Sequence, residues 1–170
     1  MGELAHALPG YFELGRRLFA RECIFLWSAG NAAQLPASFA PEVAFAGRSN
    51  VGKSSLLNAL TSRKKLARVS RTPGRTRELH FFGLGGNAEK PELCLVDLPG
   101  YGYAEAPKDK ASSWTELTRD FLRGRAALLR VFLLIDGRLG AKPIDIKFME
   151  LLDQAGVSYQ LILTKEDEVK

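Results

Sequence analysis

Gly47-Arg-Ser-Asn-Val-Gly-Lys-Ser54 is the stretch of sequence that decides the fold. It has the spacing GxxxxGK[ST], it follows the apolar run Val43–Ala46, and it precedes a helical pattern that continues to Leu60. A strand, a glycine loop and a helix in this order predict a phosphate-binding loop, in which backbone N–H groups and the helix N-terminus face phosphate oxygens. A glycine-rich turn without a ligand is the alternative, and the flanking elements argue against it.

The residue types inside this loop predict separate tasks. Gly47 and Gly52 let the backbone curl, the Lys53 ammonium reaches the terminal phosphates, and the Ser54 hydroxyl ligates Mg²⁺. We expect the whole loop to contact the nucleotide, through Gly47, Arg48, Ser49, Asn50, Val51, Gly52, Lys53 and Ser54.

Short apolar runs alternate with amphipathic stretches after Val43, which is typical of strands joined by crossover helices. We therefore expect a three-layer α/β fold of the P-loop NTPase type, with a mostly parallel central sheet flanked by helices. The expected strands are 43–46, 78–84, 93–97, 131–136 and 159–163. The expected helices are 53–60, about 110–125, and 144–154, the last one terminated by Gly156.

The length of 170 residues and the hydrophobic content of 46% suit one domain that spans residues 1–170. Residues 43–170 form the expected core of this domain. Residues 1–42 have mixed character and end in a connection with two prolines, so we expect an N-terminal lead-in packed on the domain, with a helix near 14–22.

The composition gives no sign of export or of a membrane span. The longest apolar runs, 24–27 and 131–135, are far shorter than the roughly 20 residues of a membrane-spanning helix. The N-terminal residues lack the basic and apolar regions of a signal peptide. Cys23 and Cys94 lie in apolar surroundings, which predicts buried and inert thiols. We therefore expect a cytoplasmic protein without membrane contact.

Two further segments suit the ion and the γ-phosphate. Asp97-Leu98-Pro99-Gly100 follows an apolar run, so Asp97 is expected at the carboxyl end of a strand, where it can hold Mg²⁺ through water. Thr76 is expected to bring a second hydroxyl to Mg²⁺ from a loop that orders with the γ-phosphate. A common strand-to-turn aspartate and an ordinary loop threonine are the alternatives. The predicted metal ligands are thus Ser54, Thr76 and Asp97, and the predicted catalytic groups are Lys53, Thr76 and Gly100, whose N–H senses the γ-phosphate.

Thr164-Lys165-Glu166-Asp167 follows the last apolar run with the spacing [NT]KxD and predicts the base. The Asp167 carboxylate can accept hydrogen bonds from both the ring N–H and the exocyclic amine of guanine. Adenine lacks this pair of donors and would leave the carboxylate unpaired, at a cost of about 1 to 3 kcal/mol. The Lys165 stem can lie across the ring. A solvated charged tail is the alternative, and the order of the motifs argues against it.

The net charge of +5 is concentrated in one stretch. Residues 63–77 contain seven basic residues and no acidic one, whereas the rest of the chain has more acidic than basic residues. Clustered cations without interleaved aromatic side chains suit the phosphates of structured RNA, although a solvated basic face is the alternative. The seven residues are Arg63, Lys64, Lys65, Arg68, Arg71, Arg75 and Arg77.

These motifs resemble the EngB (YihA/YsxC) family of bacterial P-loop GTPases, in the group that includes Era and the septins. The resemblance runs from about residue 23 to the end of the chain and is not confined to generic motifs. It includes the segments Asn31–Pro36, Phe45–Ser55, Lys65–Arg68, Thr72–Thr76, Asp97–Tyr103 and Leu134–Arg138.

The resemblance implies a magnesium-dependent enzyme that hydrolyses GTP to GDP and phosphate. It implies a role in assembling the large ribosomal subunit, with a link to cell division and septation. The predicted contact with that subunit or its rRNA uses the basic residues Arg63, Lys64, Lys65, Arg68 and Arg71. The implied nucleotide contacts, besides the phosphate loop, are Gly74, Arg75, Thr76, Arg77, Glu78, Asp97, Leu98, Pro99, Gly100, Thr164, Lys165, Glu166 and Asp167.

Three positions qualify the resemblance. Tyr101 stands where well-studied hydrolytic GTPases have a glutamine that orients the attacking water, so we expect slow intrinsic hydrolysis. Asn50 matches an asparagine with which related GTPases hold K⁺, which predicts hydrolysis supported by potassium. The family continues beyond the position of Lys170 with another strand, a helix and a loop that supports guanine. We therefore expect a chain that is shortened at its C-terminus relative to the family, whose sheet lacks its last strand and helix, with weakened nucleotide binding.

The favoured function is thus a slow GTPase switch, which we expect to be monomeric. The first alternative is a nucleotide-dependent ribosome- or RNA-binding module with negligible hydrolysis, which Tyr101 favours. The second alternative is a P-loop ATPase or kinase, which the segment Thr164–Asp167 opposes.

Overall fold

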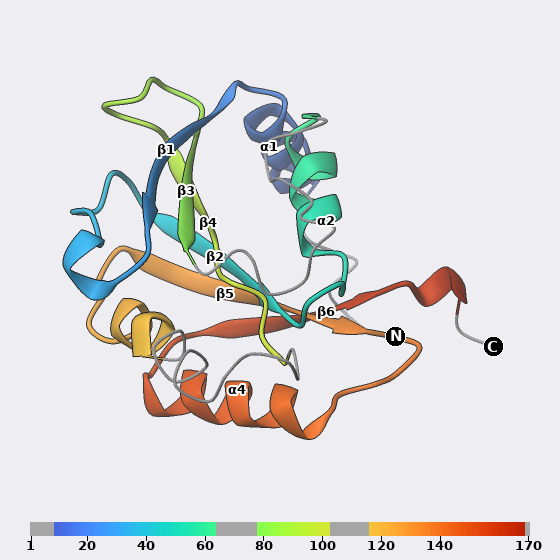
Figure 1. Cartoon of the computed structure of the whole chain (residues 1–170). Coiled ribbons are helices and arrows are strands. Elements are labelled where there is room, and N and C mark those ends of the chain that lie inside the picture. The colour runs from blue at the N-terminus through green and yellow to red at the C-terminus, as the bar shows by residue number, and fades with distance from the viewer. Residues whose placement is uncertain (1–8, 64–77, 103–115, 169–170) are drawn as a thin grey trace.

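A six-stranded sheet, ordered β1-β3-β4-β2-β5-β6, forms the centre of the computed structural model, which describes residues 9–63, 78–102 and 116–168. Helices lie on both sides of this sheet (Figure 1). The strands are β1 (Cys23–Ala29), β2 (Glu42–Gly47), β3 (Leu79–Leu84), β4 (Leu93–Asp97), β5 (Leu128–Asp136) and β6 (Tyr159–Thr164). The helices include α1 (Pro9–Phe19), α2 (Lys53–Leu60), α4 (Pro143–Gln154), a helical segment at 116–122, and the short 3₁₀ helices η2 (Ala32–Gln34) and η3 (Glu166–Glu168). In the described parts of the chain, no helix has the length and apolar character needed to cross a membrane.

Four strands form the parallel part of the sheet. β2 pairs in parallel with both β4 and β5, and β5 pairs in parallel with β6. Helices cover both faces of these central strands, so β2, β4 and the second half of β5 are nearly continuous apolar runs. The carboxyl ends of parallel strands meet at one edge of the sheet, which is where the predicted motifs begin. The expected α/β fold with a mostly parallel sheet is confirmed.

The amino-terminal part differs from the expectation. The predicted lead-in contributes a strand to the sheet, because β1 pairs with β3 in antiparallel orientation. The helix in this part covers Pro9–Phe19 instead of 14–22. Side chains of β1 alternate between the core and solvent at several positions. Because Cys23–Trp27 is apolar throughout, the sequence does not show this alternation. β3 also runs antiparallel to β4, because the short connection between them reverses the chain directly.

The remaining elements lie close to their expected ranges. α2 covers the residues expected for it, and α4 starts one residue early at Pro143. β5 begins at Leu128 instead of residue 131. The helix expected over 110–125 is helical at 116–122, and its residues before 116 lie outside the described part of the chain. Gly124, with a φ of 70°, terminates this helix earlier than expected, and Gly156, with a φ of 66°, follows α4 as expected.

Each face of the sheet has its own hydrophobic core. On one face, Phe121 of segment 116–122 and Phe148 of α4 pack against the strands. On the other face, α2 contributes Leu57, and α1 contributes Leu18 and Phe19. The two helical layers can be followed on either side of the sheet in Figure 1.

A buried ion pair fixes the start of β2. The Glu42 carboxylate is fully buried and accepts hydrogen bonds from Arg125 Nε at 2.6 Å and from Arg125 Nη2 at 2.8 Å. Arg125 Nη1 donates to the Pro36 carbonyl oxygen at 3.1 Å. The same guanidinium lies 5.4 Å from the ring centre of Phe81 and 5.2 Å from that of Phe121. Arg125 therefore ties the connection before β2 to β3 and to the end of segment 116–122.

Candidate nucleotide-binding site

The loop between β2 and α2 has the backbone that a phosphate site needs. At Gly47, an added Cβ would lie 2.8 Å from Val51 Cγ1 and 3.0 Å from the Leu134 carbonyl oxygen, so a side chain does not fit. Gly52 has a φ of 107° and stands directly before α2. Asn50 has a φ of 66°, which is uncommon for a residue with a side chain. Left-handed residues in such a loop turn successive N–H groups inward, as in anion-binding nests.

The segment Asp97–Gly100 runs beside this loop. β4 pairs with β2 as far as Asp97, which lies opposite Phe45. Beyond the two strands, the Ser49 N–H donates to the Tyr101 carbonyl oxygen at 3.1 Å. A Cβ added to Gly100 would lie 3.1 Å from Ser49 Oγ. The structure therefore brings the second predicted motif into direct contact with the phosphate loop.

Lys53 and Asp97 form an ion pair at the base of this contact. Lys53 is the first residue of α2 and Asp97 is the last residue of β4, and their side chains are only 11% and 10% exposed. Ser54 follows Lys53, so a hydroxyl and a carboxylate are both available on these two elements. Mg²⁺ in phosphate sites takes one or two such oxygen ligands besides substrate phosphates and water, so the donor set suits this ion.

Tyr101 lies in the core beside α4. Its hydroxyl donates to Asp145 Oδ1 at 2.8 Å, and its ring stacks on Phe148 with 4.9 Å between the ring centres. The residue is 3% exposed. Burial, together with the hydrogen bond to the Asp145 carboxylate, raises the pKa of the Tyr101 hydroxyl far above its usual value. The residue after Gly100 is therefore anchored to α4 through its hydroxyl and its ring.

The segment Thr164–Asp167 reaches the other side of the phosphate loop. Thr164 Oγ1 donates to the Val51 carbonyl oxygen at 2.7 Å, and Lys165 Nζ donates to the Asn50 carbonyl oxygen at 2.9 Å. Glu166 and Asp167 belong to η3 and are exposed. Three predicted motifs, which are far apart in the sequence, thus meet at the carboxyl edge of the sheet.

Only some of the other predicted contact residues belong to the part of the chain that the structure describes. Glu78 is exposed directly before β3. Arg63 makes a 3.4 Å ion pair with Glu22, and both side chains are largely exposed. The predicted nucleotide contacts Gly74, Arg75, Thr76 and Arg77 and the basic residues Lys64, Lys65, Arg68 and Arg71 lie outside the described residues.

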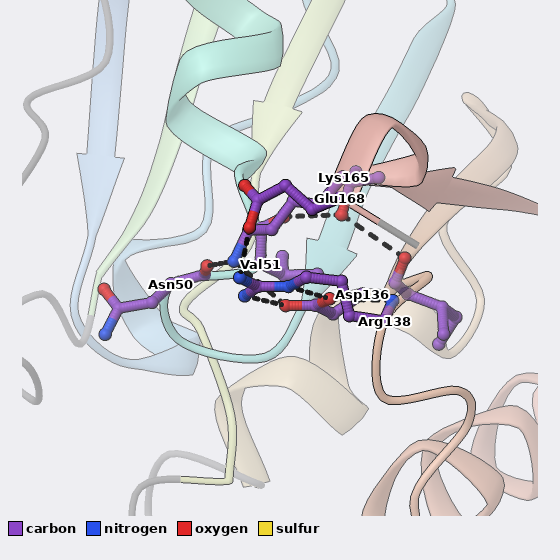
Figure 2. A network of polar contacts seen from close by, with 8 residues as sticks. Asn50, Val51, Asp136, Arg138, Lys165 and Glu168 are labelled. Atoms are coloured by element: carbon purple, nitrogen blue, oxygen red, sulfur yellow. Dashed lines mark hydrogen bonds and ion pairs between the residues drawn. The ribbon is translucent and has the colours of Figure 1, made fainter. Parts of the chain in front are cut away.

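Two residues to which the sequence analysis assigned no role also belong to this site. Asp136, the last residue of β5, accepts hydrogen bonds from Arg138 Nε at 3.0 Å, from Arg138 Nη2 at 2.9 Å and from Lys165 Nζ at 2.9 Å (Figure 2). The Arg138 guanidinium, followed by the Lys165 ammonium, holds the pKa of Asp136 well below its usual range. A signal was present in the sequence, because Asp136 follows an apolar strand just as Asp97 does.

A pocket lies where these residues face the outer side of the phosphate loop. Its lining combines loop backbone with charged side chains from the ends of β5 and β6. The lining residues are Arg48, Ser49, Asn50, Val51, Asp136, Arg138, Leu139 and Lys165.

Comparisons with known proteins agree with this geometry. The family model described as "50S ribosome-binding GTPase" matches residues 42–165. The probable GTP-binding protein EngB of Bradyrhizobium diazoefficiens is 57% identical over 158 residues, which cover 93% of this chain and 71% of that protein. The probable EngB of Rhodospirillum rubrum is 56% identical over 168 residues, which cover 99% of this chain and 71% of that protein.

Solved structures show the same fold. The crystal structure of a probable GTP-binding protein EngB has a TM-score of 0.59 and 27% identity, with 76% of this chain and 73% of that chain covered. Era in complex with MgGDPNP and nucleotides 1506–1542 of 16S ribosomal RNA has a TM-score of 0.57 and 25% identity, with 76% and 42% covered. Since the family model spans most of the chain and relatives share more than half of its residues, this chain belongs to the 50S ribosome-binding GTPases and, among them, to the EngB family of GTP-binding GTPases.

Proposed function

We propose that this GTPase is a magnesium-dependent molecular switch with slow intrinsic hydrolysis, acting in the cytoplasm in assembly of the large ribosomal subunit and linked through it to cell division and septation. One observation carries the switch: Gly100 contacts the phosphate loop while its neighbour Tyr101 is anchored to α4. A γ-phosphate that draws the Gly100 N–H toward it would therefore also act on the position of α4.

The proposal assigns the following roles to the residues of the site. Lys53 binds the terminal phosphates, and Asp97 and Ser54 hold Mg²⁺, which when bound neutralises charge on the phosphate oxygens. Asp167 recognises guanine through its paired donors. Gly74–Glu78 complete the predicted nucleotide contacts, with Thr76 as a third predicted ligand of the ion, and Asn50 is proposed to hold K⁺.

Tyr101 supports the slow rate. Its hydroxyl is occupied by Asp145, so it is not available to orient a water molecule as glutamine does in faster GTPases. Phosphate release from GTP should therefore be slow for the isolated chain. The proposed ribosomal role predicts faster release with large ribosomal subunits. The proposed role of Asn50 predicts faster release in potassium chloride than in sodium chloride. Equal rates in the two salts would contradict the potassium role. No acceleration by the subunit would favour a binding module with negligible hydrolysis.

The ribosomal role is supported by the description of the matching family and by the basic residues 63–77. Arg63 is exposed, and its ion pair with Glu22 lies at the surface, where such pairs contribute little. Binding to large subunits should weaken steeply as salt rises, because counterions are released when phosphates are neutralised. Changing Lys64, Lys65 and Arg68 together to Ala should weaken it further, and unchanged binding would contradict this surface.

Guanine recognition can be tested separately from the switch. Unlabelled GDP should displace labelled GTP, whereas ATP should not, and Asp167→Ala should remove this preference. We further propose that residues 1–170 form one monomeric domain, which the pairing of β1 with β3 supports because it makes part of the N-terminal lead-in an edge strand of the sheet. Sedimentation at several protein concentrations tests the monomer.

A further inference from the structure

Four charged side chains of alternating sign form a network of ion pairs beside the phosphate loop (Figure 2). Lys165 Nζ lies 2.9 Å from Asp136 Oδ2, and Arg138 Nη2 lies 2.9 Å from the same oxygen. Arg138 Nη1 lies 2.6 Å from Glu168 Oε2. Each cation is therefore held by at least one carboxylate, and the formal charges of the four groups cancel.

This network of ion pairs holds the base-reading segment Thr164–Asp167 and the adjoining Glu168 on both sides of Asp167. Lys165 and Glu168, which form its two ends, flank Asp167 in the sequence, whereas Asp136 is the last residue of β5 and Arg138 lies in the turn that follows it. The backbone of that turn adds another contact, because the Gly137 N–H donates to the Thr164 carbonyl oxygen at 2.8 Å. The end of β5 and the turn after it therefore hold the base-reading segment at three points.

The same contacts connect the base-reading segment to the phosphate loop. Lys165 Nζ donates both to Asp136 and to the Asn50 carbonyl oxygen, so one ammonium joins the end of β5 and the base-reading segment to the phosphate loop. Lys165 and Asn50 have left-handed backbone conformations, with φ of 59° and 66°. Such conformations are unfavourable for residues with side chains and persist where the surroundings hold them.

The contact between Asp136 and Arg138 has the chemistry of a fixed support. The Asp136 side chain is 9% exposed, so its carboxylate depends on protein donors instead of water. The guanidinium of Arg138 approaches it through Nε and Nη2, and a planar two-point contact of this kind restricts orientation as well as distance. Arg138 itself is 37% exposed, so it contributes little to a hydrophobic core.

We propose that Asp136 and Arg138 are positioning residues for guanine-nucleotide binding, which set Lys165 against the phosphate loop and hold Asp167 at the base before the nucleotide arrives. This inference rests on the proposed recognition of guanine by Asp167 and assigns the residues that keep Asp167 in place. Preorganising a binding segment raises affinity because less ordering remains to be done on binding.

The test compares Arg138→Ala, Arg138→Lys and Asp136→Asn with the control Arg130→Ala. Arg130 is a matched control because it lies on β5 and also contacts β6, through Gln160 at 3.4 Å, but at the other end of the strands. A fluorescent GDP analogue is displaced by GDP and by inosine diphosphate, whose base lacks the exocyclic amine. The ratio of the two affinities reports how well the base is read, independently of phosphate binding.

Arg138→Ala and Asp136→Asn should each weaken GDP binding by about tenfold, as expected for losing a charge-assisted hydrogen bond, and should lower the preference for GDP over inosine diphosphate. Arg138→Lys should recover part of both effects, and Arg130→Ala should match the unmodified chain. The inference is overturned if both site variants match Arg130→Ala in affinity and in preference. If Asp136→Asn does not fold, the two Arg138 variants decide the test, because they remove a side chain that is partly exposed.

Asp167→Ala separates this inference from the function on which it rests. If Asp167→Ala keeps the preference for GDP, the proposed recognition of guanine is wrong, and the inference falls with it. If Asp167→Ala loses the preference while the Arg138 and Asp136 variants keep it, the recognition of guanine stands and the positioning role alone is overturned.

Discussion

Gly47 shows how one missing side chain shapes the phosphate loop. An added Cβ would lie 3.0 Å from the Leu134 carbonyl oxygen and 2.8 Å from Val51 Cγ1, and the carbonyl belongs to a paired strand that cannot move aside easily. Gly47→Ala should therefore displace the loop and weaken GDP binding by tenfold or more, that is, by about 1.4 kcal/mol. Gly15→Ala is the control, because among the described residues no atom beyond the backbone of its own helix and its chain neighbours lies within 4 Å of its added Cβ, and nucleotide binding should stay unchanged. Normal affinity in Gly47→Ala would contradict this account.

The buried thiols permit a second prediction at the residue scale. Burial raises the pKa of Cys23 from about 9 to about 11 and that of Cys94 to about 12. At pH 8 the folded chain thus carries almost no thiolate and should react slowly with an aromatic disulfide reagent, whereas the unfolded chain should react at both thiols. Because the unfolded thiols ionise first, the stability gained from the protonated, buried thiols is fully present below pH 9. It is lost as the pH rises through about 11 for Cys23 and about 12 for Cys94. Rapid labelling of the folded chain at pH 8 would contradict the burial.

At the residue scale, the contacts that could be predicted are those between residues of spaced sequence motifs. The ion pair of Lys53 with Asp97 joins residues that end one element and begin another, and the motif order predicted that these ends would meet. Arg138 was missed because its role depends on how the turn after β5 approaches the end of β6. The sequence shows both segments, but the distance between them depends on the strand order, which no local pattern encodes.

At the scale of elements, the ion pair of Glu42 with Arg125 governs the start of β2. Arg125→Ala would leave the fully buried Glu42 carboxylate without its partner, so the free energy of unfolding should fall by about 3–5 kcal/mol. Urea unfolding measures this change. Arg123→Ala, which removes an exposed cation two residues away, should have little effect. Adding Glu42→Gln to Arg125→Ala should recover part of the loss, since it removes the unpaired charge.

Strands with both faces buried were predicted closely, and of the two edge strands β6 was predicted within one residue whereas β1 was not predicted. β2 and β4 are continuous apolar runs because helices cover both of their faces, and they were located within one residue. β1 was not expected as a strand, and its side chains Phe25 and Trp27 are exposed although both are apolar. Tertiary pairing with β3, and not local preference, makes this segment a strand.

At the scale of the whole molecule, the site joins segments that follow three different strands. The phosphate loop follows β2, Asp97 ends β4, and Thr164 ends β6, so a nucleotide that contacts all three bridges most of the width of the parallel sheet. These segments come together only in the folded chain. Ligand binding should therefore stabilise the entire fold and not only the loop that holds the phosphates.

Thermal unfolding tests this coupling. At a GDP concentration 100 times its Kd, the folded state should be stabilised by about 2.7 kcal/mol. For a chain of this size, this corresponds to a rise in Tm of about 5–10 °C. ATP at the same concentration should leave Tm unchanged. Asp167→Ala should lose the rise with GDP while keeping the Tm of the ligand-free chain, because Asp167 is exposed and supports no core. An equal rise with ATP would mean that phosphate contacts alone couple the site to the fold, and that the end of β6 has no part in choosing the base.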